Sequence, residues 1–211
     1  MGDHTSCADW GYDTHPARVD LKLRCSRLTA AIERKCRLFD RMGFDTRVGH
    51  AFMFKGMTPP QCCCILGCYR GDSSCPAISN SNVSTQHDPR VGVPFFLVLP
   101  MMGEFEKRCE ALVRVHNKWL AEKGLTQAPR NALLRFVKLL AIVLQQFLTI
   151  HPYKDGNGHS ARLLIWVMLC RAGYVPRNWD IDAKQPYADA LSAHRSGKPG
   201  ALESFLLQAI G

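Results

Sequence analysis

The sequence predicts a mainly α-helical fold with one small β element. Apolar residues recur at three- and four-residue steps over most of the chain, and two neighbouring stretches are apolar on almost every side. A third stretch, between residues 44 and 100, lacks this periodicity and is rich in turn residues. The chain has 211 residues, of which 46% are hydrophobic, which is enough for one well-buried core. We therefore expect residues 1–211 to form a single domain.

The first predicted helix covers residues 17–42. One apolar stripe runs along it, formed by Leu21, Cys25, Leu28, Ile32, Cys36 and Phe39, and Gly43 follows as a stop signal. From residue 44 to residue 100, Gly, Pro, Ser and Asn cluster, and the apolar runs between them are short, as in Phe95–Leu99. We interpret this region as loop that contains a short β-hairpin.

Helical periodicity returns near Met101 and lasts to about Glu122. The next pattern, from Pro129 to Ile150, is apolar almost all round, but four polar residues interrupt it, so we expect a buried helix and no membrane span. A second buried helix follows a short glycine turn, and residues 129–172 thus form a central helix pair. Residues 187–210 are expected to form two shorter helices.

The chain is basic, with 27 Lys and Arg against 18 Asp and Glu and a net charge of +9. These charges are scattered, and the densest group lies on the predicted helix 17–42, where a solvated basic face is the simplest interpretation. A nucleic-acid binder therefore ranks last among the possible functions, because it rests on charge alone.

The ten cysteines contain no C-x-x-C pair, and three of them, Cys62, Cys63 and Cys64, are consecutive, which suits a zinc site poorly. No secretory signal peptide is recognised, so we expect reduced thiols and a cytoplasmic location. The opening residues 1–7 also fit the M-G-x-x-x-[ST] pattern of myristoylation, which leaves delivery into a host cell as an effector as an alternative.

The stretch HPYKDGNGHSAR, from His151 to Arg162, lies between the two central helices. The free N–H groups of the second helix face the turn Gly156-Asn157-Gly158, which together make an anion site. Asp155 would repel a bare phosphate but fits as a ligand of Mg²⁺ that bridges nucleotide phosphates. Arg162 can reach the outer phosphates, and His151 is placed as a general base. This set of groups suits the transfer of a phosphorus-centred group to a Ser, Thr or Tyr hydroxyl.

The same stretch resembles the signature of the Fic family, H-P-F-x-[DE]-G-N-G-R-x-x-R, with departures at Tyr153 and His159. Weaker likenesses cover most of the chain: Gly67–Arg70 resembles a G-x-Y-R pattern before the family's flap, and Leu99–Met102 followed by Trp119-Leu120 resembles the V-P-x-x-M…W-L helix. The resemblance implies a Fic-type helical core with a small β-hairpin flap, here within 76–98, which would pair with the target protein as an added strand.

The resemblance further implies transfer of AMP from Mg-ATP to a hydroxyl of a protein substrate. His151 would deprotonate that hydroxyl, and Asp155 would bind Mg²⁺. The remaining roles fall to the nucleotide-binding residues: Gly156, Asn157, Gly158, His159 and Arg162 for the phosphates, and Tyr187 for the adenine. A homodimer is one possible assembly.

Two positions bear on activity. Many Fic proteins carry [ST]-x-x-x-E-[GN] on an inhibitory helix, and Thr29–Arg34 matches its first five positions, so we expect Glu33 to pair with Arg162 and inhibit the enzyme. At His159 the family has Arg, and a neutral imidazole makes fewer bonds to phosphate than a guanidinium. The alternatives left open are transfer of UMP, phosphocholine or phosphate, and a nucleotide-binding module or toxin component without catalysis.

Overall fold

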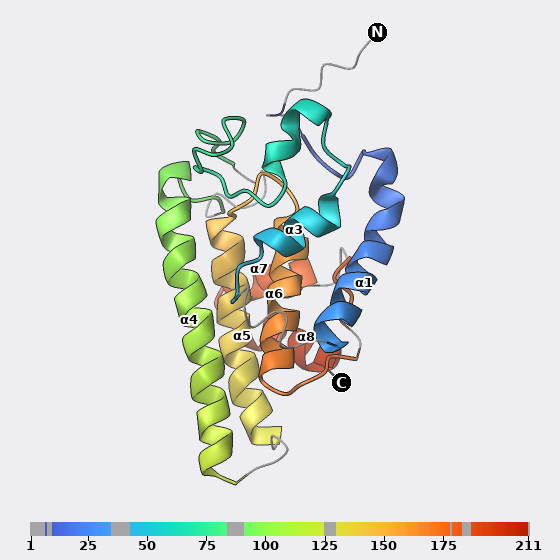
Figure 1. The fold of residues 1–211 in the computed structure, drawn as a ribbon. Helices are drawn as coiled ribbons and strands as arrows, with labels where there is room; N and C mark the ends of the chain where they lie inside the picture. The colour runs from blue at the N-terminus through green and yellow to red at the C-terminus, as the bar shows by residue number, and fades with distance from the viewer. Residues whose placement is uncertain are drawn as a thin grey trace.

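The computed structural model describes residues 7, 10–34, 43–83, 91–124, 130–177, 179–182 and 187–210, and these residues are mainly helical (Figure 1). The N-terminal half contributes one long helix and several short pieces, namely η2 (Pro16–Asp20), α1 (Leu21–Arg34), α3 (Arg47–Phe54) and η3 (Pro60–Ile65). The remainder contributes the larger helices, namely α4 (Phe95–Glu122), α5 (Arg130–Ile150), α6 (Asn157–Arg171), α7 (Tyr187–Arg195) and α8 (Pro199–Ile210).

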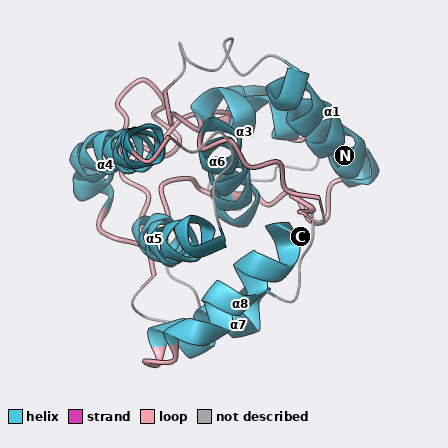
Figure 2. Ribbon diagram, turned by 90° about the horizontal axis from the view of Figure 1, so that it is seen from below, coloured by secondary structure: helices cyan, strands magenta, loops and turns pink. Residues whose placement is uncertain are grey.

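Helix α6 lies at the centre of the molecule. Helices α4 and α5 pack on one side of it, α1 and α3 pack on another, and the pair α7 and α8 closes the fold against α5 (Figures 1 and 2). Because neighbours surround α6, nearly every residue from Asn157 to Leu169 is buried. The prediction of a central pair of buried helices is therefore confirmed.

Helix α5 buries one broad apolar face. Phe136, Leu140, Leu144 and Phe147 are fully buried and recur at the spacing of helical turns. By length and composition alone, α5 could cross a membrane, but half of its most apolar window is buried inside the fold. That burial is what the core helix of a globular domain requires. The observed bounds, 130–150, agree closely with the predicted bounds, 129–150, because the apolar periodicity of this segment is strong.

The predicted β-hairpin flap at 76–98 is wrong for the residues that the structure describes. Residues 76–80 form turns, residues 81–83 have no regular structure, and Phe95–Leu99 begin α4. Strands occur nowhere in the described ranges (Figure 2). The reason lies in the core: Val98, Met102, Phe105 and Cys109 are buried at helical spacing, so the helical pattern begins within the run that suggested a strand. Residues 84–90, the remainder of the predicted flap, lie outside the described residues.

Helix α3 lies within the stretch predicted as loop. Its eight residues include Gly49, which weakens the helical signal in the sequence. The glycine allows a close approach to α6, because a Cβ at that position would lie 2.2 Å from Cδ2 of Leu163 and the leucine side chain would have to move. The close approach places His50 and Phe54 of α3 directly against the loop that begins α6.

The expectation of reduced thiols is also wrong for four cysteines. Disulfides join Cys7 to Cys62 and Cys64 to Cys75. The three consecutive cysteines at 62–64 belong to η3. Its turn directs Cys62 and Cys64 to different partners, and Cys63 is free and exposed. One bridge spans 55 residues of sequence, so spacing alone could not reveal it.

Candidate active site

The stretch His151–Arg162 consists of the loop that joins α5 to α6 and the first residues of α6, and its own side chains hold it in shape. Asn157 bridges the turn: its Oδ1 accepts a hydrogen bond from Tyr153 N at 2.9 Å, and its Nδ2 donates to Tyr153 O at 2.9 Å. The Tyr153 ring is fully buried, stacks on His50 at 4.0 Å between centroids, and its hydroxyl lies 2.7 Å from that of Thr46. The Asn157 amide therefore shapes the loop, in addition to any role toward phosphate.

His151 stands in an unusual backbone conformation. Its φ is 53°, the only positive value at a non-glycine residue among the described ranges. Burial, with a smaller contribution from the nearby charge of Arg70, lowers the pKa of its imidazole to about 4. The ring is therefore neutral at pH 7, as a proton acceptor must be.

Asp155 lies just before α6, and both of its carboxylate oxygens accept hydrogen bonds. Oδ1 accepts from Gly156 N at 2.7 Å, and Oδ2 accepts from Tyr12 N at 3.2 Å. Burial raises the pKa of this carboxyl, while the two N–H donors oppose the rise. Gly156 has a φ of 76°, and a Cβ there would lie 2.4 Å from the ring of Phe54, so the turn requires glycine.

The residues present fit Mg²⁺ delivered with a nucleotide. The described residues form no cluster of three or more His, Cys, Asp or Glu that could hold a metal alone. A single carboxylate is nevertheless what Mg²⁺ commonly takes from a protein when substrate phosphates supply further oxygens. Asp155 provides that oxygen beside the N-terminus of α6, whose N–H groups and dipole favour phosphate.

His159 is buried and bonded at both ring nitrogens. Nε2 lies 2.9 Å from Asp182 Oδ1, and Nδ1 lies 3.3 Å from the Tyr12 hydroxyl. A carboxylate only accepts, so Nε2 carries the proton and Nδ1 accepts from Tyr12. Burial lowers the pKa of the imidazole, against the opposing pull of Asp182. In this arrangement no ring nitrogen of His159 is left for a phosphate.

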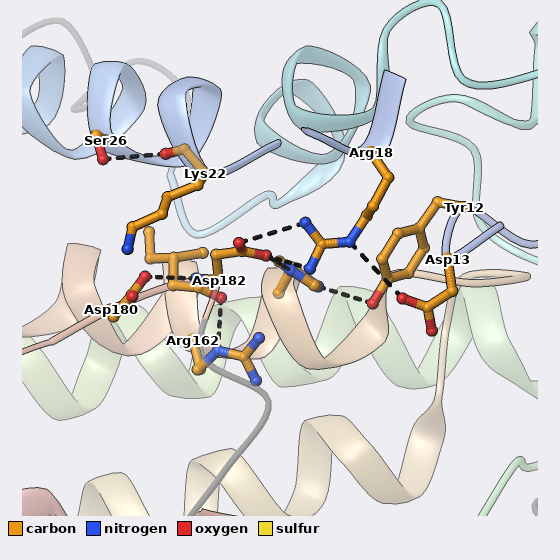
Figure 3. Close-up of polar contacts among 10 residues, drawn as sticks. Tyr12, Asp13, Arg18, Lys22, Ser26, Arg162, Asp180 and Asp182 are labelled. Carbon is orange, nitrogen blue, oxygen red and sulfur yellow. Dashed lines mark hydrogen bonds and ion pairs between the residues drawn. The ribbon is translucent and has the colours of Figure 1, made fainter. Parts of the chain in front are cut away.

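Arg162 and His159 both depend on the turn at residues 180–182. The Nε of Arg162 donates to the Ile181 carbonyl at 2.7 Å, and Arg162 is 3% exposed. Trp179 Nε1 in turn donates to Arg162 O at 2.9 Å. Figure 3 shows the guanidinium of Arg162 beside this turn, on the side opposite Arg18. The turn therefore orients the guanidinium that was predicted to bind phosphate.

A short N-terminal segment, residues 10–18, covers the loop. Besides Tyr12, it provides Arg18, whose Nη2 lies 2.9 Å from Asp182 Oδ1 and whose guanidinium lies over the Tyr12 ring at 5.7 Å. The Tyr12 ring also contacts Phe54, at 4.8 Å between centroids. Sequence reasoning missed Tyr12, Arg18 and Asp182, because they lie far from the motif and match no pattern.

Of the remaining predicted site residues, one lies away from this cluster and the side chain of the other lies outside what the structure describes. Glu33 is exposed in the last turn of α1. The α1 residue whose thiol pKa responds to the charge of Arg162 is Cys25, eight positions earlier and thus about 12 Å away along the helix. The structure therefore does not place Glu33 against the buried Arg162. Tyr187 begins α7, but its side chain lies outside what the structure describes.

Comparison with known proteins agrees with the resemblance of the sequence to the Fic signature. The Fic/DOC family model matches residues 83–169, which include α4, α5 and the whole loop. A protein named protein adenylyltransferase Fic from Culex quinquefasciatus is 33% identical over 75 residues, covering 36% of this chain and 15% of that protein. The protein of the same name from Nematostella vectensis is 30% identical over 100 residues, covering 47% of this chain and 21% of the relative.

The polar loop, with its histidine, carboxylate and glycine turn between two buried helices, resembles the signature of Fic proteins. Residues 83–169 are similar to the Fic/DOC family. The matched parts span only a small share of the relatives, 12% in the case of the Aedes aegypti protein adenylyltransferase Fic, which is 38% identical over 61 residues.

Proposed function

We propose that this chain transfers AMP from Mg-ATP to the hydroxyl of a Ser, Thr or Tyr in a target protein. The observation that carries the proposal is the single loop that holds a neutral imidazole at the end of α5 and a carboxylate at the start of α6. The adenylyltransferase names of the relatives support AMP as the transferred group.

The reaction divides among the residues of the loop. His151 accepts the proton of the target hydroxyl, whose oxygen forms a bond to the α-phosphorus of ATP. The bond between that phosphorus and the bridging oxygen breaks, and pyrophosphate leaves with the electron pair. Mg²⁺, when bound, would supply charge neutralisation for the phosphates. Asp155 would hold the metal, and the N–H groups of Gly158 and its neighbours would hold phosphate oxygens.

Arg162 completes the site as a phosphate-binding cation. Its Nε is fixed on Ile181, so the guanidinium is oriented before the substrate arrives. The inward position of His159 means that the second cation of the family motif is missing, and this favours weaker binding of the outer phosphates. A different phosphate-containing donor is the second candidate, and that same observation favours it.

One labelling experiment separates these candidates. The wild type and His151→Ala are incubated with Mg²⁺ and a protein acceptor, using ATP labelled at the α- or γ-phosphate and, in parallel, α-labelled UTP. We expect protein-bound α-label from ATP that disappears in His151→Ala. Protein-bound label from UTP, or from the γ-phosphate of ATP alone, would mean that the transferred group is not AMP. Binding of ATP without transfer of label from any donor would indicate a nucleotide-binding module.

A further inference from the structure

Arg70 is a fully buried guanidinium next to the loop. It is 0% exposed, and the hydrogen bonds described for its side chain all end on main-chain carbonyl oxygens. Burial lowers its pKa to about 10, so it is still charged at neutral pH. Burying a charge is costly unless it is well bonded, so this position requires an explanation.

The carbonyls that bind Arg70 include the end of α5. Nε donates to His151 O at 2.9 Å and Nη2 donates to Ile150 O at 3.1 Å. The last carbonyls of a helix lack partners within the helix and carry its negative dipole end. Arg70 thus supplies both the donors and the positive charge that the end of α5 needs.

Arg70 binds the backbone on both sides of His151. Its side chain donates to the Ile150 carbonyl before His151 and to the carbonyl of His151 itself, and its main-chain N–H donates to Pro152 O at 2.8 Å. These bonds hold the peptide groups on either side of a residue whose φ of 53° is disfavoured for a non-glycine. Because the backbone direction at His151 sets where its imidazole points, Arg70 controls the orientation of that ring.

Arg70 also fixes two segments beside the loop. Nη1 donates to Ser81 O at 3.0 Å, and Nη2 donates to Val93 O at 3.1 Å. Gly92 N adds a bond to Thr149 O of α5 at 3.0 Å. The chain before and after residues 84–90 is therefore joined to the same helix end that carries His151.

We propose that Arg70 is a positioning residue for the transfer reaction, which holds the backbone of His151 and the segments around Ser81 and Val93 in one fixed arrangement. This inference rests on the proposed function. Lysine can keep the charge but not the flat fork of donors that reaches four carbonyls, so Arg70→Lys separates positioning from charge. Arg70→Gln removes the charge as well.

The first test measures the rate of label transfer at saturating ATP and the KM for ATP. We expect Arg70→Lys to lower kcat by roughly 100-fold, the effect of a displacement of about 1 Å at a reacting group, with KM within about twofold. Arg47→Lys serves as the control, because Arg47 is also bonded in a fixed geometry, to Asp45. A wild-type kcat in Arg70→Lys would overturn the proposal.

The second test does not depend on turnover. The pKa of the His151 ring is measured by NMR titration, with His151→Ala to assign the signal. Arg70→Gln should raise it above the wild-type value of about 4, because a neighbouring positive charge is gone. Arg70→Lys should leave it lower than in Arg70→Gln. An unchanged value in Arg70→Gln contradicts the proposed contact, whereas a raised value together with no transfer in the wild type refutes only the proposed function.

If Arg70→Lys does not fold, as judged by circular dichroism, Gly92→Ala decides. A Cβ at Gly92 would lie 2.1 Å from Val83 O and would displace this segment while Arg70 stays. We expect the same loss of kcat with KM unchanged. A folded Gly92→Ala protein with wild-type kcat would refute the role of these segments and with it the proposal.

Discussion

The hydrogen bonds of His159 define what this residue can do. With Nε2 bonded to Asp182 and Nδ1 to Tyr12, the ring joins the N-terminal segment to the turn at 180–182. Its side chain is 2% exposed, so these bonds are shielded from water and contribute fully to stability. His159 thus serves the structure of the site, and Arg162 is the motif residue left to bind phosphate.

Replacing His159 by alanine separates these roles. Because the change removes the hydrogen bond of the Tyr12 hydroxyl and one of the bonds of the Asp182 carboxylate, which keeps Arg18, His159→Ala should lower the free energy of unfolding by about 1–3 kcal/mol. The Kd for ATP should change little, whereas Arg162→Ala should raise it about tenfold or more. Urea denaturation and fluorescent-nucleotide titration measure the two effects. An equal loss of ATP affinity in both variants would show that His159 does contact phosphate.

Glu33 provides the corresponding test of inhibition. The sequence led us to expect that Glu33→Gly would activate the enzyme by releasing Arg162. The exposed position of Glu33 instead leads us to expect unchanged incorporation of α-label and only a small loss of stability, about 1 kcal/mol, from glycine in a helix. Comparison with Glu33→Ala controls for backbone flexibility. Strong activation in both variants would restore the inhibitory role.

At the scale of elements, the N-terminal segment 10–18 would compete with the proposed Mg²⁺ for Asp155. Tyr12 N donates to Asp155 Oδ2, and a metal held by this carboxylate would draw on the same group. Binding of Mg-ATP should therefore weaken this bond and speed hydrogen exchange at the Tyr12 amide, which NMR can follow. ATP without Mg²⁺ should have a smaller effect, and Asp155→Ala should remove the difference. Exchange that Mg-ATP leaves unchanged would argue against Asp155 as the metal ligand.

The same scale shows how much the sequence could predict. Helices α5 and α6 and the C-terminal pair were predicted because long apolar periodicities are hard to mistake. Helix α3 was missed because its eight residues include a glycine, which weakens the helical pattern. The true start of α4 was missed because its run of five apolar residues fits a strand as well as a helix. The loop residues were predicted from their grouping, but Asp182 was not, because only the folded chain brings it to His159 across 23 positions.

At the scale of the whole molecule, the two disulfides bear on the predicted location of the protein. One joins Cys7 to η3, and the other joins η3 to Cys75 in the turn region that follows it. The prediction of a cytoplasmic location depended on reduced thiols, and the two bridges remove that reason. Disulfides persist mainly in oxidising compartments.

Stability of the whole fold should depend on pH through its buried histidines. Burial lowers the pKa of His50 to about 4, and its ring is held between Asp155 O at 3.0 Å and Gly67 N at 3.0 Å. Below the unfolded pKa of about 6.5, the unfolded chain binds a proton that the folded chain does not, so stability falls as the pH drops toward 4. His50 alone should contribute a loss of about 2 kcal/mol between pH 7.5 and pH 5.

His50→Gln tests this contribution directly. Glutamine does not titrate, so the variant should lose about 2 kcal/mol less than the wild type between these two pH values, whatever its stability at pH 7.5. Urea denaturation at both pH values measures the difference. The burial of His116, His151 and His159 lowers their pKa values in the same direction, so a smaller pH dependence should persist in the variant. An identical pH dependence in both proteins would mean that His50 has the same pKa in the folded and the unfolded chain, and that its bond to the Asp155 carbonyl offsets the burial of the ring.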